Sequence, residues 1–384
     1  MLGINSNINS LVAQQNLNGS QNALSQAITR LSSGKRINSA ADDAAGLAIS
    51  TRMQTQINGL NQGVSNANDG VSMIQTASSA LSSLTNSLQR IRQLAVQAST
   101  GTMSSTDQAA LQQEVAQQIQ EVNRIASQTT YNGTNILNGN AGIVSFQVGA
   151  NVGQTISLDL SQSMSAAQIG GGVVQNGQTV GSITGLSLDA NGKYTSSGAV
   201  VTAINVTSDG KGGFTFTDQN GSALTAAETS ALVVTTAAAS NGTVVSQIAM
   251  SSSAVSTSMP AAVTTAITNA VAQINAVNTP ATVSNLNIST VSGANVAMVS
   301  IDNALQTVNN VQAQLGAAQN RFTAIATSQQ AESTDLSSAQ SQITDANFAQ
   351  ETANMSKNQV LQQAGISVLA QANSLPQQVL KLLQ

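Results

Sequence analysis

Apolar residues recur at every seventh position over two long stretches, one in each half of the chain. The first repeat consists of Met53, Leu60, Ala67, Ile74, Leu81, Leu88 and Ala95. The second repeat consists of Ile301, Val308, Leu315, Phe322, Gln329, Leu336 and Ile343. A heptad repeat of this kind predicts helices that pack along a coiled-coil seam, although the core of an ordinary helical bundle gives the same local pattern. A single helix from Ala41 to Ala98 would be roughly 85 Å long.

Polar residues interrupt the second seam at Gln329 and Glu332. They indicate either a change of register or partner, or a polar layer that the seam tolerates. A shorter helix is predicted to begin after Ser104 or Ser105. Its apolar face consists of Leu111, Val115, Ile119, Val122 and Ile125.

The middle of the chain has a different pattern. Residues 143–160 and 202–218 alternate apolar and polar positions, so each predicts a β-hairpin, the second with Asp209 and Gly210 in its turn. Thr, Ser, Val and Gly dominate from about 170 to 290. A single helical patch is predicted there, at Val263, Ile267, Val271 and Ile274. The middle is therefore predicted to be a β-rich insertion.

These elements predict a mainly α protein: an elongated antiparallel bundle of long helices formed by both chain ends, with a β-hairpin and an inserted β-rich (α+β) outer domain. The two helical ends flank the insertion, so they must run back antiparallel. The predicted domains are a terminal helical domain, a long-helix domain with the hairpin, and the variable outer domain. Their boundaries are 1–43 with 341–384, 44–172 with 288–340, and 173–287.

Each chain end carries a narrow apolar stripe. The N-terminal stripe consists of Ile4, Ile8, Leu11, Leu17, Leu24, Ile28 and Leu31. The C-terminal stripe consists of Leu361, Val368, Leu369, Leu375, Val379, Leu380, Leu382 and Leu383. Ser374 and Gln377 have the spacing of a capping box with Pro376 in the first turn, which predicts that a helix begins there. A helix pair with one apolar seam and weakly polar outer faces is expected to pack against neighbouring chains.

Charged residues make up only 7% of the chain, yet five of them lie between positions 30 and 43. They are Arg30, Lys35, Arg36, Asp42 and Asp43. The first helix is predicted to end at Gly34, with the three basic residues near the negative end of its dipole. A second helix is predicted to begin at Ser39, which forms a capping box with Asp42. The charges thus mark a joint between helices, and ion pairs between subunits are a second interpretation.

Composition excludes several functions. The chain has no Cys, His or Trp, so thiol nucleophiles, imidazole bases and the usual zinc ligands are missing, and we expect no enzyme, metal site or cofactor. Twelve scattered basic residues and an isoelectric point near 4.7 argue against nucleic acid. No run of about 18 apolar residues predicts a membrane span, and the first residues do not form a secretory signal peptide. Because a surface so poor in charge favours association, self-assembly is the expected behaviour.

Several long motifs resemble those of bacterial flagellin, the filament subunit of the flagellum. They are LSSGKRINSAADDAAGLAIS, LQRIRQLAVQAS, YNGTNILNG, FQVGANVGQTI and QAGISVLAQANSLPQQVLKLLQ. The resemblance covers roughly residues 1–160 and 285–384, whereas the middle matches only as a variable insertion. It implies that paired terminal helices form an inner domain, and that these ends are disordered in the monomer and become helical on polymerisation.

The resemblance also implies a function. A flagellin-like chain is a structural subunit that self-assembles into the helical flagellar filament for motility, outside the cell. It is exported unfolded by the flagellar type III system, and a dedicated export chaperone holds its C-terminal helices. Hook-associated and cap proteins are further expected partners. Two alternatives are a hook-filament junction protein with flagellin-like termini and a filament protein whose insertion acts as an adhesin.

Host recognition is a further implication of the resemblance. The residues that match the surface read by the Toll-like receptor for flagellin are Gln89, Arg90, Leu94, Gln97 and Glu114, while Gln93 stands where many relatives have Glu. A second interpretation is that Arg90 and Leu94 pack between subunits. The segment that resembles the one read by the inflammasome sensor, also important for polymerisation, contains Val379, Leu380, Leu382 and Leu383.

Overall fold

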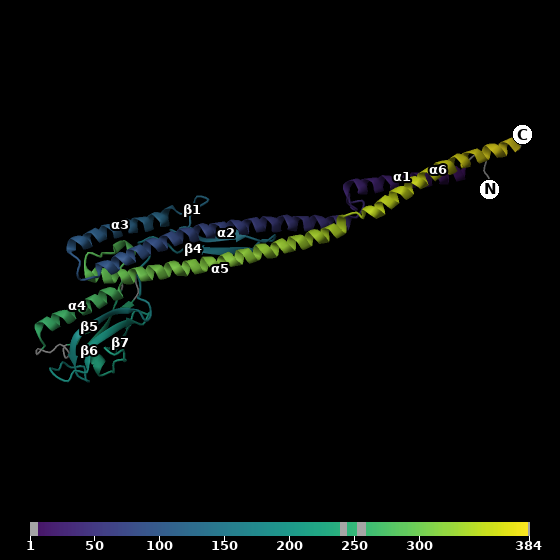
Figure 1. Cartoon of the computed structure of the whole chain (residues 1–384). Helices are drawn as coiled ribbons and strands as arrows, with labels where there is room; N and C mark the ends of the chain where they lie inside the picture. Colours follow the sequence, from purple (N-terminus) through teal and green to yellow (C-terminus); the bar gives the residue numbers. More distant parts are fainter. Residues whose placement is uncertain (1–6, 239–243, 252–258, 383–384) are drawn as a thin grey trace. The chain divides into compact units, whose positions relative to one another are not determined.

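The computed structural model describes residues 7–238, 244–251 and 259–382 (Figure 1). Its described helices are α1 (Ile8–Ser33), α2 (Ala44–Ala98), α3 (Ser105–Gln128), α4 (Ala261–Asn278), α5 (Val291–Thr344) and α6 (Phe348–Leu382). α2 has 55 residues and α5 has 54. The predicted class is confirmed: the fold is mainly α, with the long helices towards both chain ends and the strands in the middle.

Short antiparallel sheets occupy the middle of the chain. The strands are β1 (Thr130–Tyr131), β2 (Thr134–Asn135), β3 (Gly142–Gln147), β4 (Thr155–Leu160), β5 (Thr179–Leu188), β6 (Val201–Ser208), β7 (Phe214–Asp218), β8 (Leu232–Ala238) and β9 (Val244–Met250). Neighbours pair as β1-β2, β3-β4, β5-β6-β7 and β8-β9. Both predicted hairpins are present. Between β6 and β7 the turn contains Asp209 and Gly210, and Gly210 has a φ of 74°, which glycine adopts readily.

The chain divides into two compact units. The first comprises residues 1–68, 147–155 and 323–384, and the second comprises 69–146 and 156–322. Within the first unit, Gln340 donates a hydrogen bond to the Ser50 carbonyl and Ser333 donates one to Asn61. Residue numbers rise along α2 as they fall along α5, so the two helices are antiparallel here, as predicted.

Most of the predicted heptad positions lie in the helical core, whereas Met53, Leu336 and Ile343 are half-buried. Leu60 and Ala67 are buried in the first unit, and Ile74, Leu81, Leu88 and Ala95 are buried in the second. In the second unit, Phe322 is completely buried and its ring meets that of Phe146 edge-on, with centroids 5.3 Å apart. Gly70 makes room for it, because a Cβ at that position would lie 2.6 Å from the Phe322 ring.

The interruption of the second seam is a polar layer. Gln329 is only 8% exposed, and Ser333 is buried and donates a hydrogen bond of 2.9 Å to Asn61 of α2. Glu332, the other interrupting residue, points to solvent. Gln329 Oε1 has no hydrogen-bond partner among the described residues, so the bond between Ser333 and Asn61 is the contact of this layer that favours one register of α5 against α2.

In the second unit, α4 packs against β5 and β9, and this contact forms the core of the inserted domain. The predicted helical face is buried there through Ile267, Val271 and Ile274. Asn275 fixes the position of β9, because its amide accepts a hydrogen bond from the Ile248 N–H and donates one to the Ile248 carbonyl, each of 2.8 Å.

One prediction at the C-terminal end is wrong. No helix begins at Ser374, because α6 runs without a break from Phe348 to Leu382. The Ser374 hydroxyl donates to the Gln371 carbonyl inside the helix instead of capping a new one. The signal for a helix start was Pro376, which removes one N–H from a helix interior. In the structure, the side-chain amide of Asn7 takes the place of this donor and bonds the Ala372 carbonyl.

Candidate functional site

The helix pair α1 and α6, which lies in the first unit, leaves much of its apolar surface exposed. The two helices pack together through small residues, since Ala13, Ala27 and Ala372 are the buried apolar residues described on them. The large aliphatic side chains Ile8 and Leu11 remain 61% and 62% exposed. The other exposed large apolar residues on this pair are Val12, Ile28, Phe348, Val360, Leu361, Ile366 and Val368. The predicted stripes are therefore only partly covered by the pairing of the two ends.

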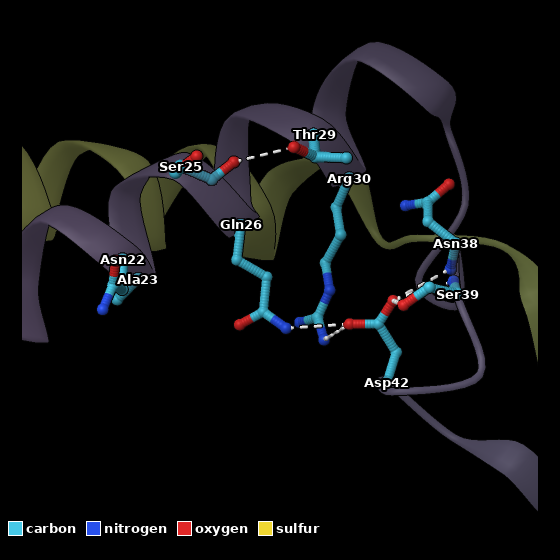
Figure 2. Close-up of a pocket in the computed structure, with 9 residues that line it drawn as sticks. All are labelled: Asn22, Ala23, Ser25, Gln26, Thr29, Arg30, Asn38, Ser39 and Asp42. Carbon is cyan, nitrogen blue, oxygen red and sulfur yellow. Dashed lines mark hydrogen bonds and ion pairs between the residues drawn. The ribbon is translucent and has the colours of Figure 1, made fainter.

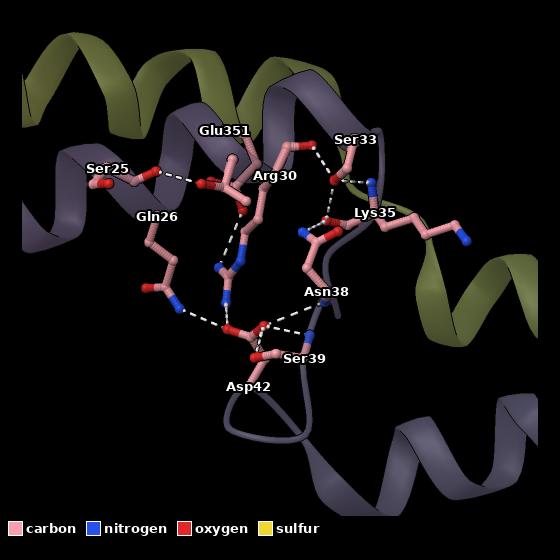
Figure 3. A network of polar contacts seen from close by, with 10 residues as sticks. Ser25, Gln26, Arg30, Ser33, Lys35, Asn38, Ser39, Asp42 and Glu351 are labelled. Carbon is pink, nitrogen blue, oxygen red and sulfur yellow. Dashed lines mark hydrogen bonds and ion pairs between the residues drawn. The ribbon is translucent and has the colours of Figure 1, made fainter.

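The end of α1 and the turn after it form a polar joint with α6 (Figures 2 and 3). α1 ends at Gly34, whose φ of 70° is the predicted left-handed cap. The Arg30 side chain reaches both carboxylates of the joint, with Nη1 3.4 Å from Glu351 Oε1 and Nη2 4.0 Å from Asp42 Oδ1. Arg30 thus links α1 to the following turn and to α6.

Asp42 organises the turn through its two carboxylate oxygens. Oδ1 accepts a hydrogen bond from Gln26 Nε2 at 3.0 Å. Oδ2 accepts bonds from the backbone N–H groups of Asn38 and Ser39 and from the Ser39 hydroxyl, at 3.0–3.2 Å. These bonds, first those of the Gln26 and Ser39 side chains, hold the pKa of Asp42 below its ordinary value of 3.8. Together with neighbouring residues of α1, the network lines an open hollow of about 560 Å³ (Figure 2).

The predicted start of the second helix is wrong by five residues. α2 begins at Ala44 and is capped by Asp43, whose Oδ1 accepts a hydrogen bond of 2.8 Å from the Gly46 N–H. Ser39 and Asp42 do bond each other, but they close the turn that precedes the helix. The reciprocal bonds of a capping box are also those of a tight turn, so the spacing alone did not separate the two.

Lys35 and Arg36 tie the joint to the connection between α5 and α6. The Arg36 N–H donates to the Thr344 carbonyl at 2.6 Å, and the Ala346 N–H donates to the Gly34 carbonyl at 2.9 Å. Lys35 and Asp345 are backbone neighbours in this short bridge. The Arg36 guanidinium donates to the Ile343 carbonyl, so it lies at the negative end of α5 rather than of α1.

The residues that match the receptor-binding motif lie on α2 and α3 of the second unit. Arg90 and Glu114 form an ion pair, with Arg90 Nη2 2.6 Å from Glu114 Oε1, and both side chains are partly exposed. Gln89 and Gln97 are exposed on α2. Leu94, in contrast, is 1% exposed and belongs to the helical core. Val379, Leu380, Leu382 and Leu383 lie outside the side chains that the structure describes.

Sequence reasoning missed several residues of these contacts, among them Glu351, Asp302 and Asn7. Glu351 is the acidic residue in the first turn of α6, and a count of charges near the chain ends could have drawn attention to it. Asp302 of α5 binds Arg92 of α2 through both carboxylate oxygens, at 2.6 and 3.2 Å, and also accepts a bond from Gln178. Asn7 carried no signal, because a lone Asn near a chain end is common.

Within the described ranges, no three acidic side chains gather as they would around a metal ion. None of the described helices offers an apolar stretch of the length that a bilayer crossing requires. What the described residues present is a long-helix framework with an uncovered apolar face on its paired terminal helices. This is the architecture of a structural subunit that associates with other chains.

The comparisons with known proteins identify the family. The bacterial flagellin N-terminal helical region matches residues 4–142, the flagellin D2 domain matches 172–277, and the bacterial flagellin C-terminal helical region matches 298–383. The B-type flagellin of Pseudomonas aeruginosa is 36% identical and flagellin B of Vibrio cholerae is 37% identical, each across 99–100% of both chains. The chain belongs to the bacterial flagellin family, whose members self-assemble into the extracellular flagellar filament.

A solved structure supports the same assignment. The structure of FliC from Burkholderia pseudomallei is 62% identical, with a TM-score of 0.61, and covers 66% of this chain and 100% of its own.

Proposed function

We propose that this chain is the repeating subunit of a flagellar filament that serves motility, and that copies polymerise through α1 and α6. The observation that carries the proposal is the row of large apolar side chains left exposed on this pair, including Leu11 and Ile366. Fully burying one such side chain contributes roughly 1.5–3 kcal/mol, so burying several between copies favours association and contributes towards the cost of ordering the two ends. A contact between different faces of identical subunits builds an open helical filament when the rotation between neighbours does not close into a ring.

Deleting residues 345–384 tests the proposal. The shortened chain should stay in solution and form no filaments, as seen by sedimentation and electron microscopy. A finer test substitutes one exposed apolar side chain: Leu11→Gln should raise the critical concentration for assembly. Val152→Gln is the matched control, since Val152 is fully exposed but lies outside the terminal helix pair. Filaments from the shortened chain, or equal effects of the two substitutions, would contradict the proposal.

We also propose that the chain leaves the cell unfolded through the flagellar type III system, and that an export chaperone binds its C-terminal helices beforehand. Hook-associated and cap proteins are the proposed partners at the filament ends. The exposed apolar surface of α6 supports a chaperone partner, because such a surface needs cover before assembly. In the dilute monomer, trypsin should cleave after Arg30, Lys35, Arg36 and Lys357 well before it cleaves after Arg92. Equal cleavage rates would mean that the ends are already ordered.

The alternative of a hook-filament junction protein predicts that the chain cannot polymerise alone. The D2 match and the full-length similarity to curated flagellins favour the filament subunit. An adhesin role for the insertion predicts that filaments lacking residues 173–287 lose surface attachment but keep their form. Electron microscopy of the purified chain separates the junction protein from the filament subunit, and an adhesion assay tests the insertion.

Recognition by the host Toll-like receptor for flagellin is the second candidate function. The exposed ion pair of Arg90 and Glu114, with Gln89 and Gln97 nearby on α2, supports it as a polar surface of fixed geometry. Because Leu94 is buried, it would act by holding α2 in place and not through its own contact. The role of Val379, Leu380, Leu382 and Leu383 in polymerisation and inflammasome recognition stays a prediction.

A further inference from the structure

Proline at position 376 leaves one carbonyl of α6 without its helical partner. In an α-helix each carbonyl accepts a hydrogen bond from the N–H four residues later, and proline has no N–H. The Ala372 carbonyl is the one that loses its donor, since α6 continues as a helix through position 376. The Asn7 side-chain amide takes this place, with Nδ2 2.8 Å from the Ala372 oxygen.

The same side chain also begins α1. Asn7 Oδ1 accepts a hydrogen bond from the Ser10 N–H at 3.2 Å, and the Asn7 carbonyl accepts one from the Leu11 N–H at 3.1 Å. The amide oxygen therefore caps α1 while the amide nitrogen donates to α6. Both polar ends of one side chain are used: the oxygen bonds within α1, and the nitrogen bonds α6.

We infer that Asn7 and Pro376 form a register pin that sets which residues of α1 and α6 face each other. The inference rests on the proposed function, because the register decides which apolar side chains the pair presents to other copies. A slip of one helical turn would move Asn7 away from Ala372 and bring it against carbonyls that already have their helical donor. Leaving both the amide and the freed carbonyl unsatisfied is unfavourable, and polar contacts of this kind are well suited to specify a register.

A close approach elsewhere on the pair makes the register measurable. Leu17 of α1 lies against Gly365 of α6, where a Cβ would be 3.8 Å from the Leu17 Cβ. This is about the average Cβ separation of a disulfide, ~3.8 Å. The chain has no cysteine of its own, so a disulfide between Leu17→Cys and Gly365→Cys reports this register alone.

The test compares three cysteine pairs in the full chain. Leu17→Cys is combined with Gly365→Cys, or with Leu361→Cys or Leu369→Cys, which are one helical turn away in either direction. The Gly365 pair should form a disulfide at least about tenfold faster than the slipped pairs, because only its geometry suits the bond. Asn7→Ser keeps a capping oxygen but removes the amide, and it should lower this preference about fivefold, the effect of losing one ordinary hydrogen bond.

Two further variants separate the effect of the register pin from a general change in helix stability. Pro376→Ala restores the N–H that bonds Ala372, so in this background Asn7→Ser should change the preference by less than about twofold. Asn18→Ser, at an exposed position of α1, is the matched control and should leave the preference unchanged. An unchanged preference in Asn7→Ser, an equal effect in both backgrounds, or no disulfide in the Gly365 pair would overturn the inference.

Sedimentation of the same samples separates this inference from the proposed function. If the disulfides depend on Asn7 as expected but the wild-type chain forms no filaments, the register pin stands and the proposed polymerisation fails. If the wild-type chain forms filaments and Asn7→Ser leaves the disulfide preference unchanged, the proposed function stands and the pin fails.

Discussion

Gly63→Ala should dislodge the turn between β3 and β4 from the surface of α2. A Cβ at position 63 would lie 2.0 Å from the Val148 carbonyl oxygen, 2.7 Å from its carbonyl carbon and 2.8 Å from Gln329 Oε1. Real Cβ contacts below 3.0 Å hardly occur, so the turn must move by at least about 1 Å. Two of the three obstructing atoms belong to backbone, which cannot rotate away as a side-chain end can.

The energetic cost follows from what that movement breaks. Overpacking of a well-packed site costs roughly 1–3 kcal/mol, and the displaced turn also loses its 2.7 Å hydrogen bond from Asn66 Nδ2 to the Gln147 carbonyl, worth about 1 kcal/mol. Replacing a helical glycine by alanine returns up to about 1 kcal/mol. The net loss of unfolding free energy should therefore be about 1–3 kcal/mol.

Urea denaturation and hydrogen exchange measure the effect. The midpoint should fall, and the amides of Val148 and Gly149, which donate to the Gln154 carbonyl, should exchange at least about tenfold faster for each 1.4 kcal/mol of local destabilisation. Gly316→Ala is the matched control. Nothing lies within 4 Å of its added Cβ, so it should be neutral or slightly stabilising. A Gly63→Ala chain as stable as the Gly316→Ala chain would refute the reasoning.

Three further predictions concern the charged groups. In assembled filaments, where the chain ends are ordered, Arg30→Gln should reduce the unfolding free energy by about 1–2 kcal/mol, measured by urea denaturation, because it removes the partly buried links to Asp42 and Glu351. No change would mean that the joint is held by its backbone bonds. The folded state keeps the pKa of Asp42 low, so its contribution to stability is complete above the ordinary value of 3.8 and is lost as the pH falls through the lower folded value. In the same filaments, the stability difference between wild type and Asp42→Asn should shrink in that acidic range, and a constant difference across it would contradict the assignment. Arg90→Ala should weaken activation of the receptor in reporter cells. Arg124→Ala, which removes an exposed ion pair within α3, should leave this activation unchanged. Equal activation by the two variants would remove the role given to Arg90.

Local rules predicted the end of α1 and, to within one residue, the start of α3. Gly34 ends α1 in the left-handed conformation, and Ser104 begins α3 with a capping box to Asp107. The start of α2 had two local solutions, Ser39 with Asp42 or Asp43 alone. Tertiary contacts selected between them, because Gln26 of α1 binds the Asp42 carboxylate and keeps it in the turn. The spacing of residues along the sequence does not reveal a contact of this kind.

The sequence predicted the faces of the long helices better than those of the terminal ones. Most heptad positions of α2 and α5 are buried because each helix has a partner over its apolar stripe. In α1, however, the buried residues are Ala13 and Ala27 while Ile8 and Leu11 are exposed. Periodicity shows that a helix has an apolar side but not which partner covers it. For the same reason the pattern could not show that Leu94 is buried while Arg90 and Glu114 remain at the surface.

Three ion-paired arginines connect secondary-structure elements in the part of the chain that the structure describes. Among the described residues, Arg30 joins α1 to Asp42 and Glu351, Arg92 joins α2 to Asp302 of α5, and Arg90 joins α2 to Glu114 of α3. Much of the remaining surface carries amides and hydroxyls. Copies of such a chain meet little like-charge repulsion when they lie side by side, because few charges remain to repel. A few ion pairs thus link the elements within each subunit, while a surface poor in charge favours association with further copies.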